Sequence, residues 1–189
     1  KERKPLLIHN LGNKLEEYNQ LSFESLTKDN PGLIIHDKNR YISLKSFLDE
    51  NQMYVNHNDT LCDSLRLKPL FDEVYNPFIS QIHCNKKYYM SLLKGKNMIP
   101  LKKNKHNLYL IHQIYGKSKL YLFNPKHIQD INGKTNESIK KYGQKINLTQ
   151  GLVLYIPIEW YYFYESEEES IIGEITSDNY FTVIYNNLR

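Results

Sequence analysis

From residue 78 onward, hydrophobic and polar positions alternate in short runs, a pattern typical of β-strands. The predicted strands are 82–93, 107–115, 119–123, 145–148, 152–156, 160–164, 171–176 and 180–185. Each run is rich in β-branched and aromatic residues, and turn-forming pairs such as Asn132-Gly133 separate the runs. Two intervening segments, 125–131 and 136–142, predict short helical turns. Many short strands at even spacing predict an all-β sandwich or barrel.

The first 77 residues have a different pattern, in which apolar residues recur at near-helical spacing. The predicted elements are a strand at 5–10, helical structure over 15–26 with Ser22 as an N-cap, a strand at 33–35, a helix from Ser43, and a weak helix over 61–75 with bends at Pro69 and Pro77. The sequence therefore predicts one mainly β domain over 1–189, with a helical N-terminal layer (1–77) on a barrel (78–189).

Composition places the chain among soluble globular proteins, with 189 residues, 40% of them hydrophobic and 24% charged. No apolar run approaches the ~20 residues of a membrane span, and the first residues do not form a signal peptide, so we expect an intracellular, cytoplasmic protein without membrane contact. Cys62 and Cys84 lack CxxC spacing and are expected to be reduced. The 16 tyrosines and the absence of alanine suggest an AT-rich genome, such as that of some large DNA viruses.

Several segments resemble a known family. Tyr41–Leu48 resembles the family helix y-x-s-l-x-x-f-l, and Gln113–Pro125 resembles Q-i-x-G-x-K-x-x-x-L-f-P-P, with Asn124 in place of one proline. Gly151–Ser166 resembles p-G-D-x-L-Y-I-P-x-x-W-W-H-x-x-x-S, and its Leu-Tyr-Ile-Pro run followed by Trp160 is the most specific part. The resemblance, which covers nearly the whole chain, is to the JmjC-like cupins. These are Fe(II)/2-oxoglutarate hydroxylase relatives that include the asparaginyl hydroxylase acting on hypoxia-inducible factor. It implies a double-stranded β-helix, a jelly-roll barrel.

The residues that hold the metal in this family have no equivalents here. Active members bind Fe(II) with a His-x-Asp pair and a distal His, which leave open positions for 2-oxoglutarate and oxygen. By the resemblance, these positions fall on Lys103 and Lys105, or in a second register on Lys102 and Asn104, with Tyr162 at the distal His. Ammonium and neutral phenol groups do not substitute for imidazoles and a carboxylate. The resemblance thus implies a degenerate member that has lost iron and 2-oxoglutarate.

The barrel mouth remains a candidate binding site, because barrel mouths are concave. The residues assigned to ligand binding are Lys102, Lys103, Lys105, Tyr109, Lys119, Trp160 and Tyr162. Ammonium groups suit phosphates and aromatic rings suit bases, and a net charge of +4 permits an anionic partner. The sequence therefore predicts a non-catalytic binding protein whose ligand is a nucleotide or RNA.

Two alternatives stay open. The chain would be an Fe(II)/2-oxoglutarate-dependent hydroxylase acting on protein or RNA if His106 or His112 served as a non-standard metal ligand. A structural or adaptor scaffold would act through a protein partner or as a homodimer, with Tyr161–Tyr164 as an exposed aromatic strip. The chain contains no Gly-rich phosphate loop, no HExxH motif and no serine-hydrolase pattern.

Overall fold

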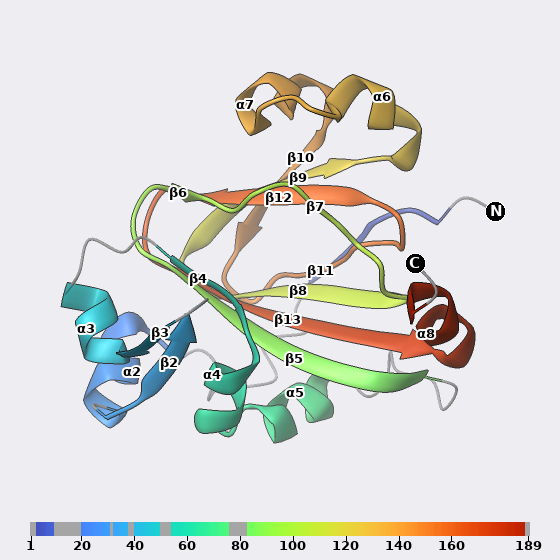
Figure 1. Ribbon diagram of the computed structural model, residues 1–189. Coiled ribbons are helices and arrows are strands. Elements are labelled where there is room, and N and C mark those ends of the chain that lie inside the picture. Colours follow the sequence, from blue (N-terminus) through green and yellow to red (C-terminus); the bar gives the residue numbers. More distant parts are fainter. Residues whose placement is uncertain are drawn as a thin grey trace.

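The computed structural model describes residues 3–9, 20–30, 32–37, 40–49, 54–75 and 83–187. Within them the fold is mainly β, as predicted, and two antiparallel sheets face each other with helices on their outer sides (Figure 1). Part of the predicted helical segment 15–26, up to residue 19, lies outside the described residues, and so does the predicted bend at Pro77.

The larger sheet has six strands in the order β1-β11-β8-β13-β5-β4. Their bounds are Leu6–Ile8 (β1), Val153–Tyr155 (β11), Leu108–Tyr115 (β8), Ser170–Asn179 (β13), His83–Leu93 (β5) and Tyr54–Asn58 (β4). β13 lies at the centre and pairs antiparallel with both β8 and β5. A bulge interrupts the pairing of β13 with β5 between Thr176 and Asp178.

The smaller sheet has the order β10-β9-β12-β6, and β7 also pairs with β12. The bounds are Gln144–Thr149 (β10), Lys117–Phe123 (β9), Tyr161–Ser166 (β12), Asn97–Met98 (β6) and Lys102–Lys103 (β7). From β5 onward the chain passes back and forth between the two sheets. Because successive side chains of a strand point to opposite faces, each strand turns alternate side chains into the space between the sheets.

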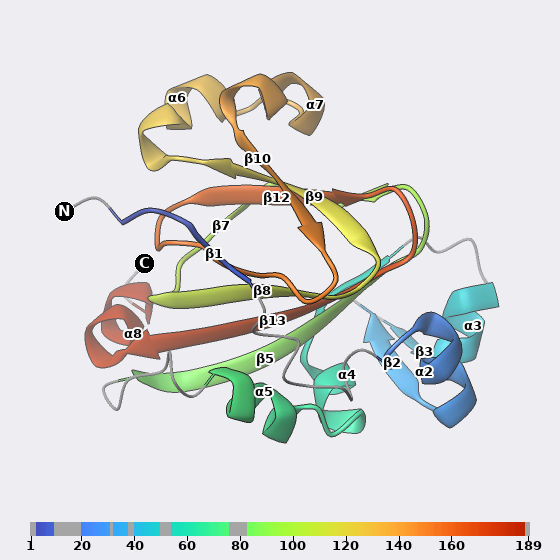
Figure 2. The ribbon, with the colours of Figure 1, turned by 180° about the vertical axis from the view of Figure 1, so that it is seen from behind.

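Three hydrophobic clusters hold these layers together. The first lies between the sheets and includes Ile111, Leu122 and Leu154. The second packs the outer face of the larger sheet against helices of the N-terminal third, and the third packs the outer face of the smaller sheet against a helical segment that follows β9 (Figure 2).

The helices on the larger sheet are α2 (Phe23–Asp29), α3 (Leu44–Asp49), α4 (Asp59–Ser64) and α5 (Lys68–Tyr75), with a hairpin of β2 (Ile34–Asp37) and β3 (Arg40–Ser43) beside them. Those on the smaller sheet are η3 (Pro125–His127), α6 (Ile128–Ile131), α7 (Asn136–Ile139) and η4 (Lys140–Tyr142). Ser22 caps α2 as predicted, because its hydroxyl accepts the Ser25 N–H at 3.0 Å. None of the described helices is long and apolar enough to cross a membrane.

The prediction for the C-terminal end of the chain is wrong. Residues 180–185, predicted as a strand, begin helix α8 (Tyr180–Asn187). The Asn179 side chain accepts the Thr182 N–H at 2.9 Å, and this cap outweighs the strand preference of the aromatic and β-branched residues. In the N-terminal third, the strand predicted at 5–10 is present as β1, and β1 and the unpredicted β4 form the two edges of the larger sheet. Pro69 produces no bend and lies in the first turn of α5, where proline is tolerated.

Candidate functional site

The space between the sheets contains a buried glutamate surrounded by hydroxyl groups. Glu174 on β13 is fully buried, and its Oε1 accepts a hydrogen bond from Ser91 Oγ at 2.7 Å. The Tyr164 hydroxyl lies 3.3 Å from the same oxygen, and the Tyr109 hydroxyl donates to Oε2. Tyr109 in turn shares a 2.7 Å hydrogen bond with the Tyr162 hydroxyl. Strands β5, β8, β12 and β13 thus each contribute to one polar cluster between the two sheets.

The tyrosines of this cluster are neutral hydrogen-bond donors. Burial raises the pKa of Tyr109, Tyr162 and Tyr164 well above 10, and the nearby Glu174 carboxylate adds to the effect. Neutral phenols are weak ligands for Fe(II), which prefers imidazole and carboxylate groups. The cluster therefore suits hydrogen bonding, and its residues do not fit an Fe(II) site of the family type.

Beside the start of β12, Asn104 fixes the lysine-rich segment that begins with β7. Its side chain is buried, and Nδ2 donates to the Ile156 carbonyl at 2.8 Å and the His106 carbonyl at 3.1 Å. Its Oδ1 accepts the His106 N–H at 2.8 Å, while its backbone N–H and C=O bond to Trp160 and Glu159. We call residues Lys102 to His106 the rim. Asn104 bonds the rim to the loop between β11 and β12, and Lys102 and Lys103 pair with β12.

The side chains of the rim carry positive charge at the surface. Lys103 forms an ion pair with Glu159, and its Nζ lies 5.7 Å from the centroid of the Tyr161 ring. Lys105 is exposed and Lys102 is half-buried. Asn186 of α8 donates to the Lys105 carbonyl at 3.0 Å, so the C-terminal helix also supports the rim.

His106 is oriented by a buried carboxylate. Its Nδ1 lies 2.8 Å from Asp178 Oδ2, and the second oxygen of Asp178 accepts the Asn107 N–H at 3.1 Å. The Asp178 side chain is 3% exposed and that of His106 is 30% exposed. Across the described parts of the chain, no three or more His, Cys, Asp or Glu side chains gather as they would around a metal ion.

His112 points away from the space between the two sheets. It alternates with Ile111 on β8 and faces the helices on the outer side of the larger sheet, where its Nδ1 lies 2.8 Å from the Tyr75 hydroxyl. Burial lowers the pKa of His112 to about 4, so the ring is neutral. His112 therefore lies on the opposite side of β8 from the space between the two sheets.

The structure separates the sequence-predicted site residues into three places. Lys102, Lys103 and Lys105 share the rim. Tyr109, Trp160 and Tyr162 lie behind it in the core between the sheets, with 1%, 9% and 3% of their surfaces exposed. Lys119 lies on the outer face of the smaller sheet, paired with Glu167. The predicted exposed strip at Tyr161–Tyr164 is also wrong, because all of these residues except the half-buried Tyr161 are in the interior.

Sequence reasoning missed Glu174 and Asp178, whose partners come from distant strands. The signal for Glu174 is a lone acid within an otherwise apolar run, Ile171–Ile175, since a charged residue in a buried strand must bond to polar groups.

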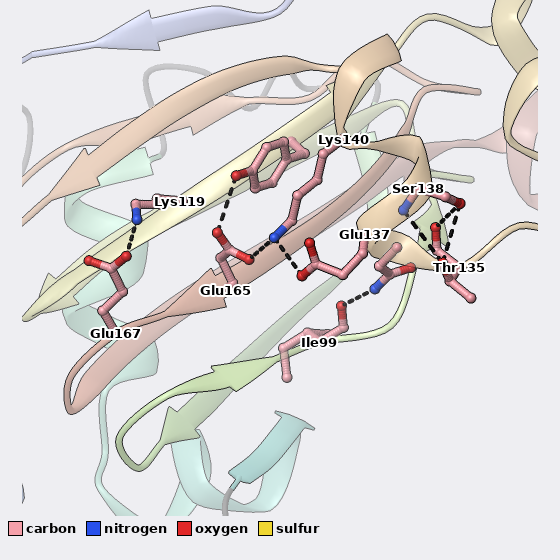
Figure 3. A network of polar contacts seen from close by, with 10 residues as sticks. Ile99, Lys119, Thr135, Glu137, Ser138, Lys140, Glu165 and Glu167 are labelled. Carbon is pink, nitrogen blue, oxygen red and sulfur yellow. Dashed lines mark hydrogen bonds and ion pairs between the residues drawn. The ribbon is translucent and has the colours of Figure 1, made fainter.

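A second polar surface lies on the outer face of the smaller sheet (Figure 3). Lys140 Nζ bridges Glu137 and Glu165 at 2.7 and 2.6 Å, and the Tyr121 hydroxyl donates to Glu165 at 3.1 Å. Although burial opposes it, bonding to these two carboxylates raises the pKa of Lys140 to about 12. Beside this network runs a groove of about 460 Å³, which we call the outer groove. Its walls are Lys117 to Lys119, Lys145, Asn147 to Thr149, Glu165, Glu167 and Glu168.

No protein-family model matches the chain, and no curated protein sequence matches it. Among solved structures, it is similar to a cupin superfamily protein from Desulfitobacterium hafniense DCB-2, with 12% identity and a TM-score of 0.37 over 53% of this chain and 72% of that one.

Proposed function

We propose that this chain is a non-catalytic binding protein built on a JmjC-like jelly-roll barrel. The strand order supports this fold, because β5, β8, β11 and β13 lie in one sheet while β7, β9, β10 and β12 lie in the other. The two segments that carry the resemblance to the metal-binding positions lie close together, since Tyr162 pairs with Lys102 and Tyr161 with Lys103.

Iron and 2-oxoglutarate chemistry is, in this proposal, lost. The side chains at the matched ligand positions have other partners: Asn104 bonds to the backbone, Lys103 to Glu159, and Tyr162 to Tyr109. Swinging one of them toward a metal would break these bonds and leave a buried polar group unpaired. His106, the remaining candidate from the alternative hydroxylase reading, is held by Asp178.

The rim is the proposed ligand site, and the observation that carries the proposal is its fixed lysine-rich segment. Because Asn104 holds the backbone in place, the backbone that carries the lysines does not have to be ordered when a ligand binds. Clustered ammonium groups attract phosphate, and the half-buried Tyr161 offers the accessible aromatic ring beside them. The buried rings of Tyr109 and Tyr162 support the rim from behind. An anionic ligand such as a nucleotide or RNA fits this chemistry best.

Trp160 makes the proposal testable without a label. It is the chain's one tryptophan, and its carbonyl accepts the Asn104 N–H at 2.8 Å, so its fluorescence should respond when the rim is occupied. We would titrate the protein with ATP and with a short single-stranded RNA at several salt concentrations. Binding should weaken steeply as salt rises, since phosphate contacts release counterions.

The matched variants are Lys105→Glu at the rim and Lys126→Glu on η3, two exposed lysines with the same change in charge. Lys105→Glu should weaken binding by roughly tenfold or more, whereas Lys126→Glu should change it little. Absence of binding, an equal loss in both variants, or an affinity independent of salt would each overturn the proposal.

A further inference from the structure

Strand β10 has one unpaired edge. It pairs with β9 along one side, from Gln144 opposite Leu122 to Thr149 opposite Lys117, and no described strand pairs with its other side. Backbone N–H and C=O groups along such an edge form a template for another strand.

This edge is the longest regular one in the two sheets. β10 keeps a continuous register with β9 over six residues, whereas β1 has three residues and β6 has two. The register of β4 with its neighbour shifts between Val55 and Asn58. Edge strands are normally protected by proline, bulges or several charges. β10 has no proline or bulge, and Lys145 is its single charged residue.

The β10 sequence is also self-complementary about Asn147. A two-fold axis perpendicular to the sheet at Asn147 would place Lys145 opposite Thr149 of a second copy. It would also place Ile146 opposite Leu148, and Asn147 opposite itself. Directly opposed residues in an antiparallel pair share a face, so in this register polar side chains meet polar ones and apolar side chains meet apolar ones. The Lys145 side chains of the two copies would therefore not lie opposite each other.

We propose that β10 pairs antiparallel with β10 of a second copy of this chain, which joins the two smaller sheets into one continuous sheet. The pairing would add about four to six backbone hydrogen bonds across the axis. Since one strand pair covers less area than a standard interface, we expect a reversible dimer with a Kd on the order of micromolar.

Two variants of the same exposed residue test the register. Thr149→Lys would place a lysine opposite Lys145 twice in each dimer, and Thr149→Glu would place a carboxylate there instead. In sedimentation velocity, the lysine variant should dimerise more weakly and the glutamate variant more tightly than the parent chain, each by a factor on the order of five at low salt. Their difference should shrink as salt is added. Monomers at all concentrations, or equal effects of both variants, would overturn the proposal.

Cysteine crosslinking provides an independent measurement. In a Cys84→Ser background, which leaves only the buried Cys62, Asn147→Cys would face its own copy at a Cα separation of about 4.5–5.5 Å. That separation suits a disulfide. Lys145→Cys is the matched control, because the two copies of residue 145 would lie about 14 Å apart. Oxidation should produce a covalent dimer of the first variant and not of the second. A different result in either variant would exclude the register, and an unlinked monomer would point to an extended segment of another protein as the occupant of the edge.

Discussion

Replacing His112 with glutamine should make the fold less sensitive to acid. His112 is 2% exposed, and its Nδ1 lies 2.8 Å from the Tyr75 hydroxyl. Burial lowers the pKa of His112 from 6.5 to about 4. The folded protein therefore binds this proton less readily than the unfolded chain does.

The sign and size of the effect follow from proton linkage. Because the folded-state pKa is the lower one, the stability linked to neutral His112 is fully present above pH 6.5 and is lost as the pH falls toward 4. At about 1.4 kcal/mol for each pKa unit, the complete loss is about 3 kcal/mol, and about 2 kcal/mol of it has occurred by pH 5.

Urea unfolding at pH 8 and pH 5 measures this difference. The parent chain and His112→Gln share all other titrating groups, so the variant should lose about 2 kcal/mol less free energy of unfolding between the two pH values. At pH 8 it should be less stable than the parent, because the bond to Tyr75 is altered. His127→Gln, at a side chain that is 38% exposed, is the control and should follow the parent. Equal losses in the parent and His112→Gln would refute the reasoning.

Two further predictions concern the barrel interior and one of its turns. Glu174→Ala removes the acceptor of several buried hydroxyls and should lower the free energy of unfolding by about 2–4 kcal/mol in urea titrations, whereas Glu174→Gln, which keeps one acceptor oxygen, should cost less. A loss below 1 kcal/mol for the alanine variant would contradict the role of the cluster. Gly116 has a φ of 71°, and a Cβ there would lie 2.0 Å from the Glu169 carbonyl oxygen. Gly116→Ala should therefore lower the melting temperature more than Gly133→Ala, whose φ is also 71° but whose surroundings are open.

The strands of the two sheets could be predicted from the sequence because their alternation matches the two-sided environment they occupy. Leu120 and Leu122 face the core between the sheets, and Lys117 and Lys119 alternate with them on the outside. The same alternation could have placed Lys119 away from the barrel mouth. Helix α8 was missed because its residues favour a strand. In the structure β13 ends at Asn179, and the side chain of Asn179 caps the helix that begins there.

The contacts of Glu174 with Ser91 and Tyr109 could not be predicted, because they join residues far apart in the chain. The pairing of β13 with β5 and with β8 brings Glu174 next to Ser91 and Tyr109. The local sequence around each residue contains no signal of this contact. The partner of His112 comes from α5, a helix outside the barrel. Motif spacing identifies groups of residues that lie near one another in the sequence. The two residues of each of these pairs do not.

The rim and the β10 edge lie on different parts of the barrel, and this decides how they act together. In β10, Gln144 pairs with Leu122 and Thr149 with Lys117, and the rim lies at the Leu122 end because Lys102 and Leu122 both pair with Tyr162. An antiparallel β10 pair would therefore direct the two rims toward opposite ends of the joined sheet. A mononucleotide would occupy each rim separately, while an RNA long enough to span both would gain avidity from the dimer. Lys105→Glu then changes affinity without changing the dimer, and Thr149→Lys changes the dimer without changing the affinity of one rim, so either proposal can fail alone.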